Sequence, residues 1–541
     1  MPINNSLFAG TEWWRGATIY QIYPRSFQDS NEDGIGDLKG ITTRLEYVAS
    51  LGVDGIWLSP FFTSPMKDFG YDVADYCGVD PIFGVLEDFD ELVERAHELG
   101  LKVIIDQVYS HTSDQHNWFT ESRANKTNPK ADWYVWADPR PDGSPPNNWQ
   151  AYFGGPSWHW DGYRKQYYLH NFLASQPDLN LHNDEVQNAL LDVTRFWLDR
   201  GVDGFRLDVV NCFMHDPELR DNPPSNRPMD IITRSFDMQL QENSESHPGI
   251  VAFLNRLRGV LDSYEGHKFT VAEVAGQNPQ SKQKAYTKGH EHLNTSYNFE
   301  YLYCDHLSGE LIEHVSQGWT SEADEGWPSW AFSNHDVPRI LSRWSDSDDP
   351  RHEAKLFLML LHSLRGNIFL YQGEELGLPQ AHVPFELLMD PEAIENWPHT
   401  LGRDGARTPM PWSPTEYQAG FTKGIPWLPL DIRHIELATD NQDQDESSVL
   451  NFSRQILSRR QYSPALRLGD ISFLVADHDT LAFERTHEDE NYLCIFNFSK
   501  HERLLPVDLP RTARQVLSTE PGFADQPPTI LPAHSGYWLT F

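Results

Sequence analysis

Charged residues interrupt several short apolar runs of this sequence, and they stand at the ends of those runs. In GVDGFRLDVVN (residues 201–211), whose apolar positions predict a buried strand as far as Val210, Arg206 and Asp208 lie two residues apart. Because side chains alternate between the two faces of a strand, both charges are expected on one face. A buried charge is costly unless it is paired or used in chemistry. The pair therefore predicts a functional site at the end of this strand.

Two further acidic residues occupy similar positions. Glu273 ends the run TVAEV, and Asp336 ends FSNHD with His335 beside it. His111, in DQVYSHTS, also follows an apolar run. Any one of these acids alone is explained by a helix cap or an ion pair, but the set is not. Crowded carboxylates repel, which raises one pKa and separates an acid from a nucleophile. Glycoside cleavage uses this arrangement, with carboxyl groups about 5 to 5.5 Å apart in a retaining enzyme.

The segments that must position these residues alternate between strand-like and helix-like patterns. LKVIIDQV, from Leu101, is continuously apolar, as is typical of a parallel strand covered on both faces. DFDELVERAHELG and DEVQNALLDVTRFWLDRG each carry one apolar stripe of helical period. The other strand candidates are ATIYQIYPRSF, GVDGIWLSP, HKFTVAEV, PSWAFSNHD and GNIFLYQGEE. These units predict an α/β fold, a closed (β/α)₈ TIM barrel whose site lies at the carboxyl ends of its strands.

Two parts of the chain depart from this alternation. Residues 109–177 are rich in Trp, Tyr, Asn, Pro and Gly without periodicity, which predicts a subdomain inserted after the third strand. Residues 462–541 contain short alternating strands without helices between them, which predicts a C-terminal antiparallel β-sandwich domain. The barrel is accordingly expected to comprise residues 1–108 and 178–461.

Composition restricts the class of partner. The chain has 541 residues, with 43 Lys and Arg against 79 Asp and Glu, and a formal net charge of −36. This balance argues against nucleic acid, because a phosphate backbone needs a basic surface. The four scattered cysteines suit neither a disulfide framework nor a metal site. The first ten residues lack the features of a signal peptide, and no run of about twenty apolar residues occurs. We expect a cytoplasmic monomer or homodimer that binds neither membrane nor nucleic acid.

Four segments resemble the signature segments of glycoside hydrolase family 13, the α-amylase family. They are DQVYSH, DGFRLDVVN, TVAEV and FSNHD, and QPDLN at Gln176 resembles a fifth. IYQIYPRSFQDSNEDGIGDLKGI, QYYLHNF and GRDGARTPMPW resemble the exo-acting α-glucosidase branch of that family. The resemblance covers nearly the whole chain. It implies a retaining α-glucosidase that releases α-glucose from the non-reducing end of short, maltose-type α-glucosides, with a capacity for transglucosylation and without an organic cofactor.

The resemblance also implies roles for single residues. Asp208 is the expected nucleophile, with Arg206 keeping it ionised and oriented. Glu273 is the expected acid that protonates the leaving oxygen and then activates water. Asp336 is expected to bind sugar hydroxyls and to favour the distorted ring. Further hydrogen bonds to the same glucose are expected from His111 and His335.

Other residues are expected to shape the pocket. In the exo-acting branch, an aspartate matching Asp68 pairs with an arginine matching Arg403 and closes the pocket on the terminal glucose. Tyr71 is expected to stack on the apolar face of the sugar. Phe153 and Phe172, from the inserted subdomain, are candidate pocket walls, and the alternative is that they form the core of the subdomain itself.

The loop DSNEDGIGD (residues 29–37) resembles the first part of a calcium loop. Its expected ligands are Asp29, Asn31, Asp33, the carbonyl of Ile35, and Asp37. The terminal glutamate of an EF-hand is missing, and an acidic turn that caps a helix is the alternative. Since the exo-acting branch binds Ca²⁺ or Mg²⁺ in the same loop, the resemblance implies one structural ion, distant from the sugar.

Some features leave the specificity open. Val209 follows the nucleophile; in this branch a valine there tends to accompany α-1,6 cleavage, whereas threonine or alanine accompanies α-1,4 cleavage. DQVYSHTS instead resembles a bacterial group that contains strict α-1,4 enzymes. Ser110 stands where most of the family has asparagine, so the calcium site of the amylases between barrel and subdomain is not expected. An oligo-1,6-glucosidase acting on isomaltose-type substrates is therefore an alternative.

Two more alternatives share the scaffold. A sucrose isomerase or sucrose hydrolase would use the same acids, but the Arg-Leu-Asp-Arg-Asp run typical of sucrose isomerases is missing. A catalytically inactive partner of a transporter would need a membrane helix and would usually have lost the acids, and the sequence shows neither feature.

Overall fold

The computed structural model describes residues 11–226, 234–276, 278–289, 291–319, 326–347, 349–400, 402–520 and 526–541. The first ten residues, on which the expectation of an absent signal peptide depends, lie outside these ranges. None of the helices in the described ranges is long and apolar enough to cross a membrane.

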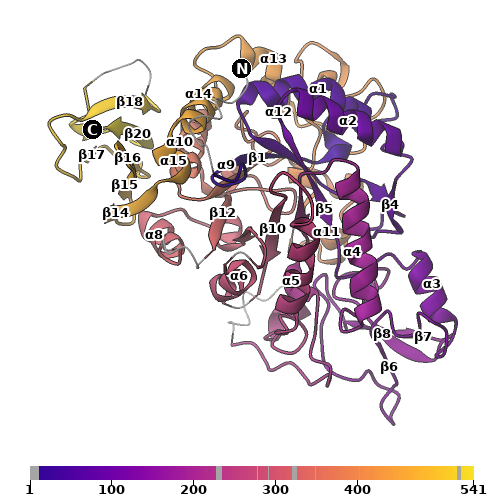
Figure 1. The fold of residues 1–541 in the computed structure, drawn as a ribbon. Coiled ribbons are helices and arrows are strands. Elements are labelled where there is room, and N and C mark those ends of the chain that lie inside the picture. Colours follow the sequence, from indigo (N-terminus) through magenta and orange to yellow (C-terminus); the bar gives the residue numbers. More distant parts are fainter. Residues whose placement is uncertain are drawn as a thin grey trace.

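Eight parallel strands close into a barrel at the centre of the molecule (Figure 1). Their order around the barrel is β1 (Thr18–Ile22), β13 (Asn367–Tyr371), β12 (Trp327–Ala331), β11 (Thr295–Asn298), β10 (Phe269–Val274), β9 (Gly204–Leu207), β5 (Lys102–Gln107) and β2 (Gly55–Leu58). This confirms the predicted TIM barrel. Seven strands coincide with candidates found from the sequence, with β12 beginning one residue before PSWAFSNHD. The eighth, β11, has the sequence TSYN, and the apolar pattern gave no sign of it.

Helices cover the outside of the barrel because each has one apolar face. In α4 (Asp184–Asp199) the predicted stripe, from Val186 to Trp197, is buried. The other long helices are α1 (Leu38–Leu51), α2 (Leu86–Glu98), α5 (Ile250–Leu261), α6 (Pro279–Thr287), α8 (Gly309–Gln317), α10 (Pro350–Ser363) and α14 (Val449–Tyr462). Shorter ones are α7 (Glu300–Tyr303), α9 (Ile340–Trp344), α11 (Pro391–Glu395), α12 (Ile432–Glu436), α13 (Thr439–Asp443) and α15 (Pro464–Leu468).

Strand β9 is shorter than the sequence predicts. It ends at Leu207, whereas the apolar pattern predicts a strand as far as Val210. Val209 has φ 35°, in the left-handed region that β-branched residues rarely adopt, and Val210 begins a short 3-10 turn. Within the barrel, Arg206 is the register partner of Asp106 on β5 and of Val271 on β10. This register brings the arginine beside carboxylates of both neighbouring strands.

Two loops of the barrel carry small sheets. After β2, the pair β3 (Phe62–Thr63) and β4 (Asp75–Val79) is antiparallel. Residues 109–177 contain helix α3 (Asn117–Ala124) and the sheet β6 (Trp136–Ala137), β8 (Gln166–Leu169) and β7 (Trp158–Asp161), in that order. The sheet encloses a small core with Trp149, Trp158 and Leu169.

The C-terminal part is an antiparallel sheet domain, as predicted. Its five strands are β14 (Asp470–Ala476), β15 (Thr480–His487), β16 (Glu490–Asn497), β20 (Ser535–Thr540) and β18 (Arg514–Ser518). The second layer is the pair β17 (Arg503–Leu504) and β19 (Ile530–Leu531), and Leu531 packs on Ile495 and Leu539 of the larger sheet. The domain lies beside α8, α10 and α15, on the side of the barrel away from α3 and its sheet (Figure 1).

Candidate active site

One buried guanidinium joins three carboxylates at the end of β9. Arg206 Nη1 lies 2.8 Å from Asp106 Oδ1 and 2.5 Å from Asp208 Oδ1, and Nη2 lies 2.6 Å from Glu273 Oε2. The arginine is fully buried, and its guanidinium lies 5.1 Å from the centre of the Trp57 ring. The structure therefore brings the predicted nucleophile and the predicted acid together on one cation, and it adds Asp106 to them.

The two predicted reacting acids differ in how they meet Arg206. Asp208 accepts a charge-assisted hydrogen bond, which favours its ionised form against the burial that raises its pKa. Nη2 lies at ion-pair distance from Glu273 Oε2, but it forms no hydrogen bond with that carboxylate. Burial raises the pKa of Glu273 to about 8, Arg206 opposes the rise, and the charges of Asp208 and Asp336 add to it. Burial raises the pKa of Asp208 as well, to about 7, so of the two acids Glu273 holds its proton to the higher pH.

Asp336 is held ionised by three cationic or polar neighbours. Arg407 Nη2 lies 2.6 Å from its Oδ1, Arg403 Nη1 lies 3.5 Å from the same oxygen, and His335 Nε2 lies 3.2 Å from Oδ2. Burial by itself would raise the pKa of Asp336, but these neighbours lower it well below its usual range. The carboxylate can accept hydrogen bonds from a sugar at any ordinary pH.

The two predicted histidines are buried and neutral. Burial lowers the pKa of His335 to about 3 and that of His111 to about 4. His335 Nδ1 faces the amide nitrogen of Gln21 at 2.8 Å, so it accepts, and the proton lies on Nε2. Nε2 is 2.6 Å from the hydroxyl of Tyr71, whose ring stacks on the imidazole with centroids 5.4 Å apart. His111 Nε2 is 3.0 Å from the carbonyl oxygen of Tyr71.

A second buried ion pair lies beside the reacting acids. Arg403 Nη2 lies 2.8 Å from Asp68 Oδ1 and 2.7 Å from Asp390 Oδ1, and Gln176 donates to Asp68 Oδ2 at 3.1 Å. The side chains of Asp68 and Arg403 are only 5% and 8% exposed. Since Arg403 also reaches Asp336, this cluster is continuous with the reacting acids.

The two predicted wall residues lie beside this cluster. The guanidinium of Arg403 is 5.1 Å from the centre of the Phe153 ring, and the Phe172 ring is 5.2 Å from that of His111. The two phenylalanine rings are 5.9 Å apart. Neither belongs to the core of the inserted subdomain around Trp149. The geometry therefore favours the pocket over the alternative of a subdomain core.

Sequence reasoning missed several residues of this site. Asp106 and Gln176 lie inside motifs that were recognised, in LKVIIDQ and QPDLN, but they were not singled out. Arg407 lies four residues after Arg403 in GRDGARTPMPW, and its place in the same motif could have marked it as a second arginine of the site. Asp390 lies in a segment without any motif. Tyr297, whose hydroxyl accepts from Arg206 Nε at 3.1 Å, belongs to the unrecognised strand β11.

The acidic loop 29–37 forms a series of turns. Asp29, Asn31 and Asp33 each accept, through a side-chain oxygen, the N–H two residues further on, at 2.8 to 3.0 Å. Asp37 accepts from the N–H of Gly40 at 2.7 Å and so caps α1. The candidate ligand atoms for a metal ion are all oxygens, which suits Ca²⁺ or Mg²⁺. The carboxylates of the three aspartates, however, do not all lie within 4.8 Å of one another. The ion in this loop stays a proposal.

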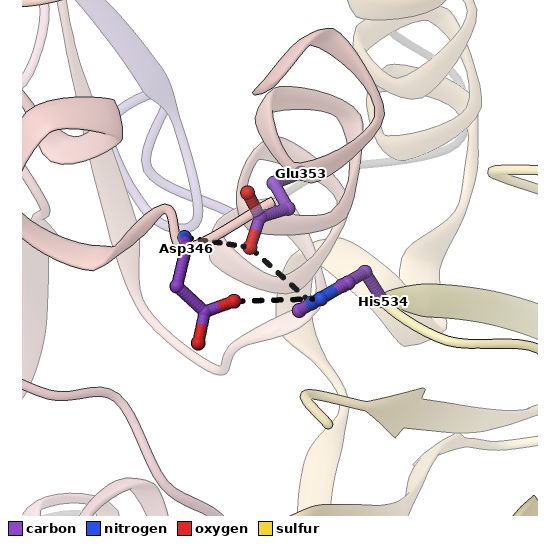
Figure 2. Close-up of side chains that lie close together, drawn as sticks. All are labelled: Asp346, Glu353 and His534. Atoms are coloured by element: carbon purple, nitrogen blue, oxygen red, sulfur yellow. Dashed lines mark hydrogen bonds and ion pairs between the residues drawn. The ribbon is translucent and has the colours of Figure 1, made fainter. Parts of the chain in front are cut away.

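One trio of possible metal ligands does occur in the described part of the chain, and Figure 2 shows it at the junction with the C-terminal domain. It consists of Asp346, Glu353 and His534. The two ring nitrogens of His534 face different carboxylates, at 3.5 Å to Asp346 and 3.2 Å to Glu353. Lys500 also pairs with Asp346, at 3.1 Å. This arrangement is a network of ion pairs that joins the C-terminal domain to α10.

Comparisons with known proteins agree with this geometry. Residues 21–469 match the family model described as the catalytic domain of α-amylase. The chain is 52% identical to a probable α-glucosidase of Rhizobium meliloti, covering 90% of each chain. It is 38% identical to an oligo-1,6-glucosidase of Heyndrickxia coagulans, covering 91% of this chain and 93% of the relative. The crystal structure of an α-glucosyl transfer enzyme superposes with a TM-score of 0.92, at 49% identity over 98% of this chain and 99% of the other. The chain belongs to the α-amylase family, glycoside hydrolase family 13.

Proposed function

We propose that this protein is a retaining, exo-acting α-glucosidase that releases α-glucose from the non-reducing end of short α-glucosides. The observation that carries the proposal is the junction of two buried clusters, the acids around Arg206 and the Asp68–Arg403 pair, through Asp336. The first cluster supplies the chemistry. The second supplies a closed end that limits the substrate to one terminal glucose.

The first half of the reaction uses Asp208 and Glu273 together. Asp208 Oδ attacks C1 of the glucose while Glu273 gives its proton to the glycosidic oxygen, so the C1–O bond breaks and the leaving sugar departs neutral. The raised pKa of Glu273 supports its role as the proton donor at neutral pH. The hydrogen bond from Arg206 keeps the nucleophile ionised until the ester forms.

The second half regenerates both groups. A water molecule gives its proton to the Glu273 carboxylate and its oxygen attacks C1, which breaks the ester bond to Asp208. Because C1 is inverted twice, the released glucose keeps the α configuration. Asp336, ionised throughout, accepts hydrogen bonds from the sugar and favours the positive charge that develops on the ring.

The closed end supports exo-action. Gln176 donates to Asp68, while Asp390 and Asp336 pair with Arg403, and we expect this packed cluster to stop a chain of sugars at its terminal glucose. Short substrates such as maltose are expected to be good, and starch poor. Isomaltose-type substrates are a second candidate, because the chain is also similar to an oligo-1,6-glucosidase.

The experiment that tests the proposal is a substrate panel of maltose, isomaltose, sucrose and amylose with product analysis. Release of glucose from the first or second sugar, as the α anomer in NMR spectra recorded early in the reaction, is expected. Isomeric disaccharides from sucrose would favour the isomerase alternative. Efficient internal cleavage of amylose, a β anomer, or no turnover of any sugar would contradict the proposal.

Retention also implies transfer. An alcohol or a sugar can take the place of water in the second half, and the likeness to an α-glucosyl transfer enzyme supports this capacity. Transfer products are expected to increase with the concentration of the acceptor, and they would carry an α linkage.

A further inference from the structure

The hydroxyl of Tyr297 lies between the buried arginine of the site and the predicted acid. It accepts a hydrogen bond from Arg206 Nε at 3.1 Å and donates to Glu273 Oε1 at 3.5 Å. The tyrosine is buried, so water does not compete for either contact. No step of the proposed hydrolysis gives this hydroxyl a part.

The register of the barrel explains this position. Glu273 on β10 and Tyr297 on β11 are register partners, so their side chains leave the two strands on the same face. The tyrosine ring belongs to an apolar cluster with Trp57 on β2 and Phe369 on β13, and its centroid is 5.8 Å from that of Phe369. Because this packing fixes the ring, the barrel itself sets the place of the hydroxyl.

The two contacts give the hydroxyl one direction. Arg206 is always charged and can only donate, so the Tyr297 oxygen accepts from it and the phenolic proton is left for Glu273. Hydrogen bonds in a chain polarise one another, so the guanidinium makes this O–H a stronger donor. Arg206 therefore acts on both oxygens of Glu273. It meets Oε2 directly as an ion pair at 2.6 Å, and it reaches Oε1 through Tyr297.

The two oxygens of Glu273 differ in their surroundings. Oε2 accepts the N–H of Val209 at 3.2 Å and lies beside Arg206 Nη2. A proton on Oε2 would face both an N–H group and the charge of the guanidinium. This arrangement favours Oε1 as the oxygen that carries the proton of the neutral acid, and Oε1 is the oxygen that Tyr297 contacts.

We propose that Tyr297 is a positioning residue, which directs the acid of Glu273 through Oε1 and stabilises the carboxylate that forms when the proton leaves. The inference rests on the proposed function. A hydroxyl donates more strongly to a carboxylate than to a neutral carboxyl group, so the contact strengthens as Glu273 gives its proton to the glycosidic oxygen. The distance of 3.5 Å agrees with this role, because catalytic hydrogen bonds are often long in the free enzyme and tighten during the reaction.

The same contact should limit how strongly Glu273 holds its proton. Burial raises the pKa of Glu273 to about 8, Arg206 opposes the rise, and the charges of Asp208 and Asp336 add to it. The charged and titratable groups that face this carboxyl are Arg206, Asp106, Asp208, Asp336 and Tyr297. Tyr297 donates to the ionised form, so its hydroxyl works with Arg206 to lower the pKa. Removing the hydroxyl should therefore raise the pKa of Glu273 further.

The test measures the pH dependence of kcat/KM in Tyr297→Phe, which keeps the ring and removes only the hydroxyl. The alkaline limb for maltose should move up by about 0.5 to 1 pH unit, because the carboxylate loses a hydrogen bond. Below that limb, kcat/KM for maltose should fall about threefold to tenfold, because Glu273 becomes a weaker and less well directed acid. For p-nitrophenyl α-glucoside, whose leaving group needs no proton, it should fall less than about twofold.

A matched control comes from β1. Tyr20 is also buried, and its hydroxyl donates at 2.6 Å to Glu375, a carboxylate that is not among the reacting acids. Tyr20→Phe removes the same atom from the same kind of contact. It should lower the Tm but leave the alkaline limb, and the ratio of kcat/KM for the two glucosides, at the parent values. A hydroxyl with only a structural role at Tyr297 would give the same result as this control.

Incorporation of 3-fluorotyrosine at position 297 tests the opposite direction. The fluorinated phenol is more acidic and donates more strongly, so the alkaline limb should move to lower pH. This variant decides if Tyr297→Phe does not fold. An unshifted limb in a folded Tyr297→Phe, shifts of the same sign in the two variants, or equal losses on the two glucosides would overturn the inference. A parent protein that turns over neither glucoside would instead overturn the proposed function.

Discussion

The guanidinium of Arg403 lies 2.8 Å from the carboxylate of Asp68, although 335 residues separate the two in the sequence. Because both side chains are buried, each depends on the other for compensation of its charge. Asp68→Asn keeps the shape and removes the charge. We expect kcat/KM for maltose to fall by about 100-fold or more, and the activity on longer glucans to rise relative to that on maltose.

A neighbouring ion pair provides the control for this prediction. Lys67 pairs with Asp114 at 3.1 Å, but their side chains are 42% and 33% exposed. An exposed pair contributes less than about 1 kcal/mol, so Asp114→Asn should leave kcat/KM within about fivefold of the parent. Equal effects of the two substitutions would show that Asp68 does not close the pocket.

The nucleophile assignment predicts a large loss of turnover without loss of the fold. Asp208→Asn should lower kcat by several orders of magnitude, because no bond to C1 can form. Asp208→Ala supplied with azide should release a β-glucosyl azide, since the azide attacks from the face that the carboxylate occupied. Asp192→Asn, a change at an exposed ion pair, is the control. A kcat close to that of the parent protein, in a pure preparation of Asp208→Asn, would contradict the assignment.

The barrel could be predicted from sequence where its strands are long and apolar, as in LKVIIDQ. Strand β11 could not, because TSYN contains no apolar run and its pairing with β10 and β12 exists only once the barrel closes. The observed end of β9 also differs from the predicted one. Val209 is apolar and β-branched, so the pattern extends the strand, yet its N–H turns to donate to Glu273 at 3.2 Å and the strand stops.

The reacting acids could be predicted because motifs mark them, whereas their partners depend on register. Asp106 is one polar residue in a buried strand, and only its pairing with Arg206 across β5 and β9 shows why it is charged. Asp390, which holds Arg403, lies in a segment with no pattern at all.

The pH dependence of kcat/KM should be bell-shaped. Activity falls at low pH because Asp208 becomes protonated. Burial raises the pKa of Asp208, so this acid limb lies at a higher pH than an ordinary aspartate would give. It falls at high pH as Glu273 loses its proton, near its raised pKa of about 8. Glu273→Gln should abolish the alkaline limb and should slow substrates with poor leaving groups more than activated aryl glucosides. An alkaline limb that persists in this variant would point to another acid.

The loop 29–37 should bind one structural ion. Removing divalent ions with a chelator should lower the Tm, and Ca²⁺ or Mg²⁺ should restore it, because an ion that binds only the folded state stabilises it. Asp33→Asn should weaken this response. Asp142→Asn, at an exposed turn with a similar hydrogen bond to Ser144, should retain it. If the parent holds no metal and its Tm ignores the chelator, the loop is a turn that caps α1 through Asp37.

The linkage preference should depend on the residue after the nucleophile. Val209 is partly buried beside the acids, and its backbone N–H donates to the Glu273 carboxyl, so its side chain stands at the edge that the leaving sugar must pass. Threonine has nearly the same shape and adds a hydroxyl, so Val209→Thr changes polarity with little change in packing. We expect the ratio of kcat/KM for maltose to that for isomaltose to rise in this variant, measured with the same preparation.

The control is Val210→Thr, the next residue, which is buried away from the pocket in the 3-10 turn and should cost stability without shifting the ratio. A ratio equal to that of the parent would exclude Val209 as the selector and would transfer that role to the pocket walls Phe153 and Phe172.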